Sequence, residues 1–345
     1  MLEIDGSMGE GGGQVLRSAL SLACLTGKGF RICNIRKNRP QSGLMRQHLM
    51  AVRAAARIAS ANVSGDELGS PQLSFLPDGV ASGEFHFDIG TAGAATLVLQ
   101  TVIPPLCRGR KASRVTVTGG THVPFSPSWH YFSEVFWPSV VRLGVRGEPF
   151  AEAFGFYPKG GGRIGCVVMP TGQPEPWTLR ERGELTGIRI VSAVGNLARG
   201  IAERQAQSAL AALRGRVERG VPTEIEVQEL RVFGQGTFLF VKAVYEHAVA
   251  GFTSLGERGK PAEQVGAEAA REFIEHHESG AAVDPHLADQ LVLYLARAGG
   301  TSRFRTSRLT RHLATNLLVA GCFLDLSSRI EGREGEPGVV TITPA

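Results

Sequence analysis

A glycine-rich segment near the amino end has residue types that suit the binding of a phosphate group. Residues 9–13 read Gly-Glu-Gly-Gly-Gly, between an expected strand at Leu2–Ile4 and an expected helix over Gln14–Thr26. Such a loop turns backbone N–H groups toward an anion at the start of the helix. Arg17 would add a charge-assisted hydrogen bond, and Glu10 beside phosphates is most simply explained as a ligand of a divalent metal. The segment matches neither the Walker loop nor the dinucleotide-binding pattern, so a tight structural turn is the alternative.

A basic cluster follows in the next loop and on the next predicted helix. Arg36 and Arg39 precede Pro40, which predicts an extended segment that presents both guanidinium groups from a loop. Apolar residues at helical spacing predict a helix over residues 43–60. The cluster suits a polyphosphate or the end of an RNA, and a solvated basic face is the alternative. The further arginines on this helix are Arg46, Arg53 and Arg57.

The pair Asp284 and Pro285 predicts the start of another helix, because aspartate is a favourable N-cap and proline suits the first helical position. His286, Asp289 and Gln290 then share one face near the helix start. Asp and Gln side chains together accept and donate hydrogen bonds, as the edge of a purine requires. An uncommitted polar helix face is the alternative.

A last helix is predicted to begin at Ser307 or Thr310 and to run through Ala320, with His312 on its polar side. A lone surface histidine usually carries no chemistry, so the residues by themselves leave the role of His312 open. Polar neighbours of His312 at helical spacing are Arg308, Thr315 and Asn316.

The other histidines form no recognisable site. His276 and His277 are expected at an exposed helix end, and His122 and His130 flank a proline-rich loop. The chain has no GxSxG elbow and no HExxH zinc motif.

Composition limits the class of protein that holds these residues. The 345 residues include 44 glycines, 43% hydrophobic residues and 20% charged residues, with a net charge of +5. These values exclude a disordered chain and collagen, and they give a mild preference for anionic partners. Five cysteines without a CxxC pair argue against a disulfide framework or a zinc site. Neither a secretory leader nor a membrane span is predicted, so a reducing cytoplasm is the expected compartment.

Short apolar runs alternate with amphipathic helical patterns, which predicts an α/β or α+β fold. A second glycine cluster at Tyr157–Arg163 hints at an internal repeat. Residues 185–280 are predicted to form an inserted domain, with the large domain in 1–184 and 281–345. The elements expected in the insert are strands at Ile188–Val194, Thr223–Arg231 and Thr237–Tyr245 and helices at Ile201–Val217 and Pro261–His276.

Eight stretches together resemble the RNA 3′-terminal phosphate cyclase family over nearly the whole chain and in the family's order. The family usually has a basic residue before Gly155, where this chain has Phe154. The matching stretches are Gly9–Arg17, Gly43–Leu49, Thr91–Gly93 with Leu99–Gln100, Gly119–Thr121, Gly155–Gly162, Gly256–Glu263, Ala288–Leu291 and His312–Asn316.

The resemblance implies a large domain of repeated units, each with two helices on a four-stranded sheet, and a smaller inserted α/β domain. It implies that ATP drives the conversion of an RNA 3′-phosphate to a 2′,3′-cyclic phosphate, with release of AMP and pyrophosphate. His312 matches the family's nucleophile, which would carry AMP covalently, and Glu10 would hold Mg²⁺ or Mn²⁺. A homo-oligomer is compatible with this picture.

The resemblance also assigns residues to the two substrates, ATP and the RNA 3′-phosphate end. The nucleotide site would comprise Gln100, His286, Leu287, Ala288, Asp289 and Gln290. The contacts to pyrophosphate or to the RNA terminal phosphate would come from Arg17, Arg36, Arg39 and Gln47.

Two other functions stay open at this point. A non-catalytic, cyclase-like RNA-binding protein of ribosome assembly would keep the fold and the basic surface but lack the nucleophile. An enolpyruvyl transferase would share the repeated α/β unit but is expected to lack the His312–Asn316 stretch. The presence of His312, Glu10 and Gln100 favours the enzyme over the binding protein.

Overall fold

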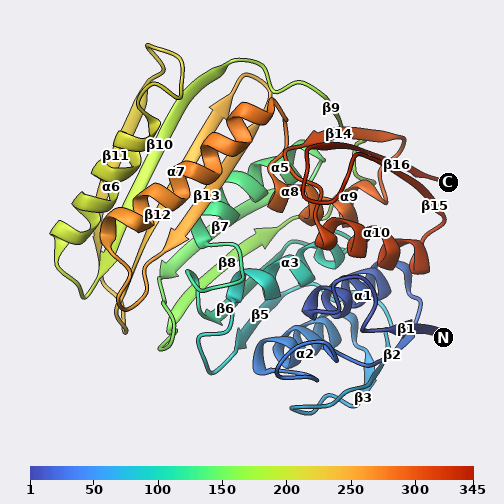
Figure 1. Ribbon diagram of the computed structural model, residues 1–345. Helices are drawn as coiled ribbons and strands as arrows, with labels where there is room; N and C mark the ends of the chain where they lie inside the picture. The colour runs from blue at the N-terminus through green and yellow to red at the C-terminus, as the bar shows by residue number, and fades with distance from the viewer.

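The computed structural model describes residues 1–345 and contains four sheets of four strands each (Figure 1). In the first sheet the strand order is β1-β2-β4-β3; β1 and β2 are parallel and the other pairs are antiparallel. The elements of this first unit are β1 (Leu2–Asp5), α1 (Gly13–Thr26), β2 (Phe30–Cys33), α2 (Arg46–Ala59), β3 (Asn62–Ser64) and β4 (Leu73–Leu76).

The same strand arrangement occurs twice more, in sheets ordered β5-β6-β8-β7 and β15-β16-β14-β9. The second unit contains β5 (Glu84–Asp88), α3 (Ala95–Leu106), β6 (Ser113–Gly119), α4 (Trp129–Tyr131), the π-helical turn η1 (Phe132–Phe136), α5 (Trp137–Arg142), β7 (Gly147–Ala153) and β8 (Gly162–Val168). The third contains β9 (Thr178–Leu179), α8 (Pro285–Gln290), α9 (Val292–Leu295), β14 (Ser302–Thr306), α10 (Arg311–Phe323), β15 (Leu326–Glu331) and β16 (Gly338–Pro344). The repeat that the second glycine cluster hinted at is therefore threefold.

The segment of the sequence between β9 and α8 forms a fourth sheet, ordered β11-β10-β12-β13. Helices α6 and α7 pack against each other and against this sheet. Its elements are β10 (Leu185–Gly195), α6 (Arg199–Leu213), β11 (Thr223–Leu230), β12 (Gly236–Tyr245), β13 (Val249–Leu255) and α7 (Ala262–Ser279). The predicted α/β class is confirmed. The predicted domain boundaries at 185 and 280 stay a prediction about independent folding.

One helix end and two strands differ from what the sequence predicts, each for a local reason. The helix expected to reach Val217 ends at Leu213, because Arg214 adopts an extended conformation and Gly215 follows with a positive φ of 72°. Strand β13 was not predicted, because Gly251 and two hydroxyl residues interrupt the alternation of apolar and polar side chains that marks a strand. Strand β15 was not predicted because it is largely exposed and polar.

The helices of the three repeated units pack against one another, while their sheets lie outside them (Figure 1). Helix α1 contacts α2, α3 and α10, so elements from all three units meet around it. One cluster of buried apolar side chains extends through all four sheets, including Phe30, Val117, Phe304 and Phe240. The inserted sheet therefore shares its core with the rest of the chain.

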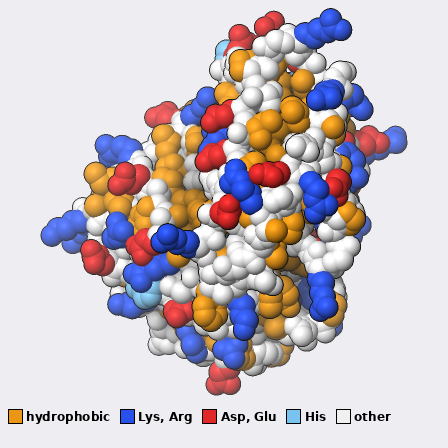
Figure 2. All heavy atoms as spheres, turned by 90° about the vertical axis from the view of Figure 1, so that its left-hand side faces the viewer, with side chains coloured by type: hydrophobic (Ala, Val, Ile, Leu, Met, Phe, Trp, Pro, Cys, Tyr) orange, Lys and Arg blue, Asp and Glu red, His pale blue; other side chains and the backbone are white.

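The outer side of the inserted sheet carries intermingled basic and acidic side chains (Figure 2). Its edge strand β11 alternates glutamates with apolar residues, and Glu224 and Glu229 are exposed. Charged side chains on an edge strand oppose pairing with another sheet. None of the helices is both long enough and apolar enough to cross a bilayer.

Candidate active site

A cavity of about 1420 Å³ opens where the three repeated units and the inserted sheet meet. Only 10 of its 40 lining residues are hydrophobic, so it suits a polar or charged ligand. Its wall includes the starts of α1 and α2, the loops before α3 and α4, and residues of α8 and α10. Helix α1 begins at this wall without a side-chain cap, which leaves its first N–H groups available to a ligand.

The glycine-rich loop contacts α10 directly. The backbone N–H of Glu10 donates to Thr315 Oγ1 at 3.0 Å, and Thr315 Oγ1 in turn donates to the carbonyl of Arg311 at 2.6 Å. Gly9 has a φ of 58°, and a Cβ at this position would overlap Thr315 Oγ1. The close approach therefore requires glycine. It places Glu10 beside the helical turn that carries His312.

Glu10 is the charged partner of His312. His312 Nδ1 lies 3.6 Å from Glu10 Oε1, and Arg39 donates to Glu10 Oε2. The Glu10 side chain is 7% exposed, whereas that of His312 is 49% exposed and lines the cavity. Partial burial lowers the pKa of His312, assisted by Arg17 and Arg39 and opposed by Glu10. The imidazole is therefore mainly neutral near pH 7, as a nitrogen nucleophile must be.

Four arginines line the cavity and give it a positive wall. Burial lowers the pKa of Arg17 to about 10, although Glu10 and Asp289 favour its charge, so Arg17 is still protonated at pH 7. The predicted extended segment before Pro40 is wrong: Lys37 N–H donates to the Asn34 carbonyl at 3.1 Å, and the chain forms turns. The four arginines are Arg17, Arg36, Arg39 and Arg46.

The other two arginines of the predicted basic cluster lie outside this wall. Arg53 pairs with Asp66 at 3.7 Å, and the Arg57 guanidinium lies 6.0 Å from the centre of the Phe85 ring. They are the solvated part of the helix, because α2 turns only its first residues toward the cavity.

The residues predicted for the nucleotide site divide between the cavity and the core. Asp284 caps α8 by accepting from the backbone N–H groups of the next turn at 3.0 and 2.9 Å. Gln100 Nε2 donates to Gln290 Oε1 at 2.7 Å, which links α3 to α8. Leu287 and Ala288 are buried and absent from the cavity lining, so any role there is limited to their backbone. The predicted members that line the cavity are Gln100, His286, Asp289 and Gln290.

The polar face expected on α10 is wrong in part, because two of its members are buried in a hydrogen-bonded junction. Thr315 contacts the glycine-rich loop, and Asn316 Oδ1 accepts from Ser18 Oγ at 2.6 Å. Asn316 Nδ2 also donates to the Asp289 carbonyl at 2.8 Å. This junction joins α1, α8 and α10 beneath the cavity. Burial raises the pKa of Asp289 well above its usual value, which favours a neutral carboxyl.

Two side chains at the start of α2 accept hydrogen bonds from backbone N–H groups. Gln47 Oε1 accepts from Ala94 N–H at 3.0 Å, and His48 Nδ1 accepts from Met45 N–H at 3.3 Å. Both side chains line the cavity, and burial lowers the pKa of His48 to about 3. Gln47 thus joins the loop before α3 to the wall that carries the arginines.

The inserted sheet and α7 contribute wall residues that the sequence analysis did not identify, namely Gly251, Thr253 and Glu272. Ser128 Oγ and Thr253 Oγ1 lie 2.9 Å apart and link the proline-rich loop to β13. No local motif marks these residues, because their place at the cavity results only from the packing of the insert.

His122, His130 and His276 are buried and His277 is partly buried, so the predicted exposed helix end is wrong. His276 is buried with Nδ1 3.1 Å from Ser307 Oγ, because the end of α7 packs against the third unit. His122 Nε2 and His130 Nδ1 lie 2.9 Å apart, and the Phe154 ring packs edge-on against His122. Phe154 therefore belongs to a packed aromatic cluster in this chain.

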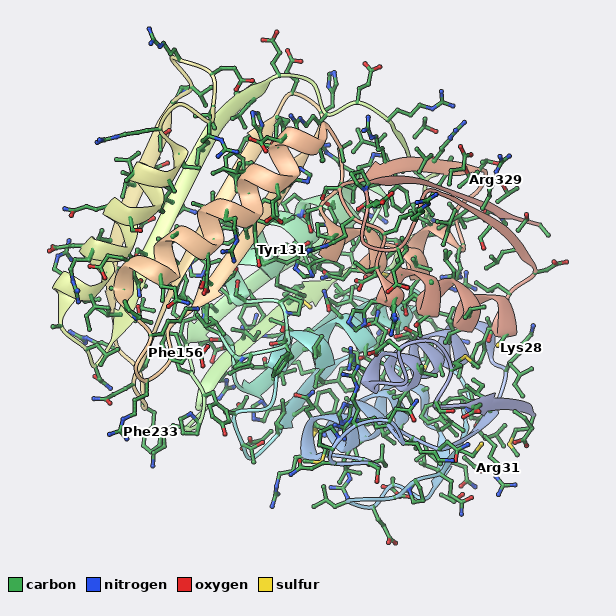
Figure 3. All side chains as sticks on the ribbon, viewed as in Figure 1. Lys28, Arg31, Tyr131, Phe156, Phe233 and Arg329 are labelled. Atoms are coloured by element: carbon green, nitrogen blue, oxygen red, sulfur yellow. The ribbon has the colours of Figure 1, made fainter.

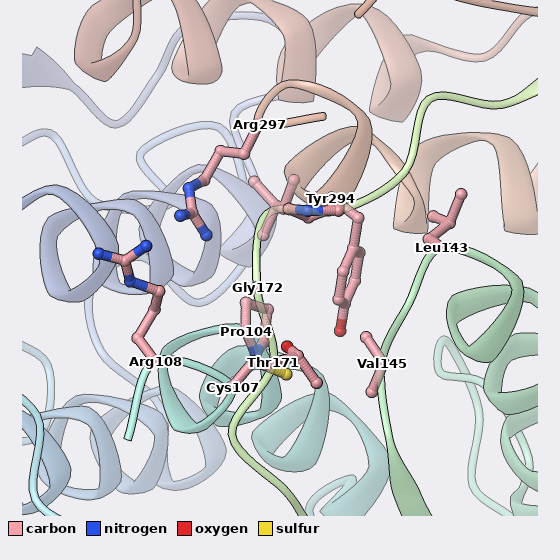
Figure 4. Close-up of a pocket in the computed structure, with 11 residues that line it drawn as sticks. Pro104, Cys107, Arg108, Leu143, Val145, Thr171, Gly172, Tyr294 and Arg297 are labelled. Carbon is pink, nitrogen blue, oxygen red and sulfur yellow. The ribbon is translucent and has the colours of Figure 1, made fainter. Parts of the chain in front are cut away.

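A second hollow lies behind Tyr294 and Leu293, which line both spaces (Figure 4). It has a volume of about 10 Å³, close to that of one water molecule. Arg108 and Arg297 lie on one side of it and Cys107 and Thr171 on another (Figure 4). Its size excludes it as a nucleotide site, whereas the large cavity has room for a nucleotide.

The cavity does not hold a set of three or more side chains that could bind a metal ion without help. A single carboxylate is nevertheless the usual protein ligand of Mg²⁺ when phosphate oxygens and water complete the coordination. Glu10 suits this role, since it is the carboxylate beside His312 and the arginines. In the structure its two oxygens contact Arg39 and His312.

A family model described as RNA 3′-terminal phosphate cyclase matches residues 8–330. A protein of that name from Methylococcus capsulatus is 45% identical over 331 residues, covering 94% of this chain and 91% of its own. The one from Methanosarcina barkeri is 43% identical, covering 97% of this chain and 98% of its own. Among solved structures, the enolpyruvyl transferase NikO from Streptomyces tendae aligns with 95% of this chain and 46% of its own at 11% identity and a TM-score of 0.36.

Proposed function

The chain belongs to the RNA 3′-terminal phosphate cyclase family, and on that premise we propose that it uses ATP to convert an RNA 3′-phosphate to a 2′,3′-cyclic phosphate through a covalent His312–AMP intermediate. One observation carries the proposed mechanism: a half-exposed histidine pairs with a buried carboxylate in a cavity lined by four arginines. A binding protein without chemistry has no need of this arrangement.

The first step transfers AMP to the enzyme. A neutral ring nitrogen of His312 attacks the α-phosphorus of ATP, a P–N bond forms, and the P–O bond to pyrophosphate breaks. Because Nδ1 faces Glu10, a proton is favoured on Nδ1, and the Nε2 lone pair is left for the attack. Arg17 and its neighbours in the wall neutralise the charge of the triphosphate.

A divalent metal would contribute charge neutralisation at the phosphates, and Glu10 is the residue that would hold it. The Arg39 contact would then be exchanged for contacts of Arg39 with phosphate. Arg36 and Arg39 lie on one loop and both line the cavity, so this loop supplies two cations to a phosphate group bound there.

The second and third steps activate and close the RNA end. An oxygen of the RNA 3′-phosphate attacks the phosphorus of His312–AMP, which frees the histidine nitrogen. The vicinal 2′-OH then attacks the 3′-phosphorus, AMP leaves, and the hydroxyl proton passes to solvent. Arg17, Arg36, Arg39 and Gln47 are proposed to hold the pyrophosphate or the RNA terminal phosphate during these steps, since all four line the cavity.

The test is incubation of the protein with α-labelled ATP. We expect a labelled protein, release of pyrophosphate, and a bond that is labile to acid and stable to alkali, as a phosphoramidate is. His312→Ala should abolish labelling and cyclisation while the fold is kept, because the side chain is half exposed. His86→Ala, on the exposed face of β5, is the matched control. Label retained in His312→Ala would exclude this nucleophile, and an unlabelled wild type would point to the non-catalytic alternative.

A further inference from the structure

Three exposed aromatic side chains lie on loops next to the cavity. Phe125 is fully exposed, Tyr157 is 67% exposed and Phe233 is 75% exposed. Large aromatic side chains are mostly buried in proteins, so three neighbouring exposed rings require an explanation. Phe125 also has a φ of 61°, a conformation that is costly for a bulky residue.

The three loops run side by side. His122 and Phe156 pair as a backbone bridge, as do Phe154 and Val232. Phe125 lies in the loop that contains His122. In the sequence Tyr157 directly follows Phe156, and Phe233 directly follows Val232.

Two of the three rings line the cavity, and the third lies outside it. Phe125 and Tyr157 line the cavity itself. Phe233 lies against Gly161, where a Cβ would be 3.3 Å from the Cβ of Phe233. Figure 3 shows Phe233 at the outer tip of the inserted sheet, beyond Phe156. Together the rings form a path from the cavity toward the insert.

A rigid aromatic layer supports these loops. The rings of His122 and Phe238 stack with their centres 4.2 Å apart, and Phe154 and Phe156 pack against His122 with centres at 5.3 and 5.6 Å. All four residues are at least partly buried. The exposed rings are therefore presented from a fixed base, which reduces the entropy lost when a flat ligand stacks on them.

The charges beside the path identify the class of ligand. Arg36, Arg39 and Arg46 line the same cavity as Phe125 and Tyr157, and Lys159 lies against Gly234, the neighbour of Phe233. Aromatic rings alternating with basic groups are how proteins hold single-stranded nucleic acid, because bases stack on rings while cations follow the phosphates. An apolar protein partner would not need the basic groups.

We propose that Phe125 and Tyr157 stack on the unpaired nucleobases at the RNA 3′ end, and that Phe233 with Lys159 holds the strand further upstream. This inference rests on the proposed function. It specifies the substrate as a single-stranded 3′-phosphate end of any sequence, because stacking does not distinguish bases strongly. A blunt duplex end keeps its bases paired and cannot use the platform.

The experiment separates the two half-reactions. Self-adenylation with ATP is measured first, and transfer from preformed enzyme–AMP to a 3′-phosphorylated RNA oligonucleotide is measured second. Phe125→Ala and Tyr157→Ala should each lower kcat/KM of the second reaction by about 5- to 150-fold, the range for loss of one stacked base. Phe125→Trp should retain the rate. Leu68→Ala, which removes an exposed apolar side chain outside the cavity, should change neither reaction.

Altered RNA ends test the stacking partner directly. An oligonucleotide with abasic residues at its 3′ end should be a poorer substrate for the wild type, and the penalty should largely disappear in Phe125→Ala. A blunt duplex should behave like the abasic strand. Phe233→Ala should slow transfer to a long strand and leave a 3′-phosphorylated dinucleotide unaffected.

The outcomes distinguish the two proposals. A wild type that forms no enzyme–AMP contradicts the proposed function. A wild type that cyclises RNA while the ring variants transfer AMP normally overturns the platform alone. Slower self-adenylation in Phe125→Ala or Tyr157→Ala also overturns it, since the rings would then serve the adenine of ATP. Thermal unfolding of all variants should match the wild type, because these side chains are exposed.

Discussion

At the scale of single residues, Glu10 is the side chain on which most of the proposed chemistry converges. It pairs with His312, accepts from Arg39 and belongs to the glycine-rich loop at the cavity wall. A role in metal binding and a role in orienting the imidazole make different predictions, because only the first alters the response to metal concentration.

Glu10→Ala is expected to slow self-adenylation by orders of magnitude and to shift its metal dependence to higher concentration. Added metal should restore the rate only in part, because the contact to His312 is also lost. Glu3→Ala removes an exposed carboxylate from the preceding strand and serves as the control. Titration of Mg²⁺ and Mn²⁺ against the labelling rate is the measurement. An unchanged metal dependence with a slow rate would leave Glu10 as a positioning residue only.

Asp289 and Gln290 are proposed to contact the nucleoside of ATP, and their variants should affect one half-reaction only. Asp289→Ala and Gln290→Ala should each weaken self-adenylation at limiting ATP by roughly 2- to 13-fold, the cost of one lost neutral hydrogen bond. Because burial favours the neutral form of the Asp289 carboxyl, the range for a neutral hydrogen bond applies to this residue. Transfer of AMP from preformed enzyme–AMP to RNA should stay near normal.

The matched control for this pair is Gln264→Ala, an exposed glutamine on α7. Normal adenylation by both α8 variants at limiting ATP would mean that the nucleotide binds elsewhere in the cavity. A loss confined to Gln290→Ala would instead indicate that its contact with Gln100 is the essential one.

At the scale of elements, the approach of the glycine-rich loop to α10 decides whether Glu10 reaches His312. Gly9 and Thr315 are in direct contact there, and Ser18 and Asn316 fasten α1 to the same helix. The start of α1, which has no side-chain cap, is thus held by packing between units, whereas α8 and α10 are capped by Asp284 and Thr310.

Gly9→Ala is expected to impair self-adenylation strongly, because the added Cβ overlaps Thr315 and must displace Glu10. The variant should also lose about 1–2 kcal/mol of unfolding free energy from its left-handed backbone. Gly27→Ala is the matched control, since Gly27 has a φ of 71° but open space around it. It should show the loss of stability and keep the labelling rate. Equal activities of the two variants would contradict the positional role of Gly9.

At the scale of the whole molecule, buried histidines in several units make stability dependent on pH. Burial lowers the pKa of His48 to about 3, of His130 to about 4 and of His276 to about 3, and it lowers the pKa of His122 well below its usual value. Below about pH 6.5 the unfolded chain takes up protons at these residues and the folded chain does not. Each histidine then removes up to about 1.4 kcal/mol of stability per pH unit.

Two aspartates have the opposite effect on the free energy of unfolding, but they are fewer than the buried histidines. Burial raises the pKa of Asp284 to about 6 and that of Asp289 well above its usual value, so both stabilise the fold as the pH falls toward 4. The net expectation is a falling free energy of unfolding from pH 6.5 to pH 4, measured by denaturant titration. His276→Asn, which removes one titrating ring, should make the slope shallower. A constant or rising stability over this interval would contradict the expectation.

Much of the local structure follows from the sequence by itself. Helix starts and ends were predicted where a short-range signal exists, as at Gly27, Asp284 and Thr310, since capping depends on only a few neighbouring residues. The arrangement of motifs along the chain also predicted the family, which the comparisons confirm. The α/β class followed from the alternation of strand and helix patterns.

Tertiary structure alone decided which of these residues meet. Glu10 and His312 come from opposite ends of the chain, and only the packing of α1 against α10 brings them to 3.6 Å. The same packing buries Thr315 and Asn316, whose polar side chains indicated a solvated face. The insert adds Thr253 to the cavity without any motif. Periodicity and capping report on neighbours along the helix or strand, whereas burial and side-chain contacts depend on elements that the chain brings back from a distance.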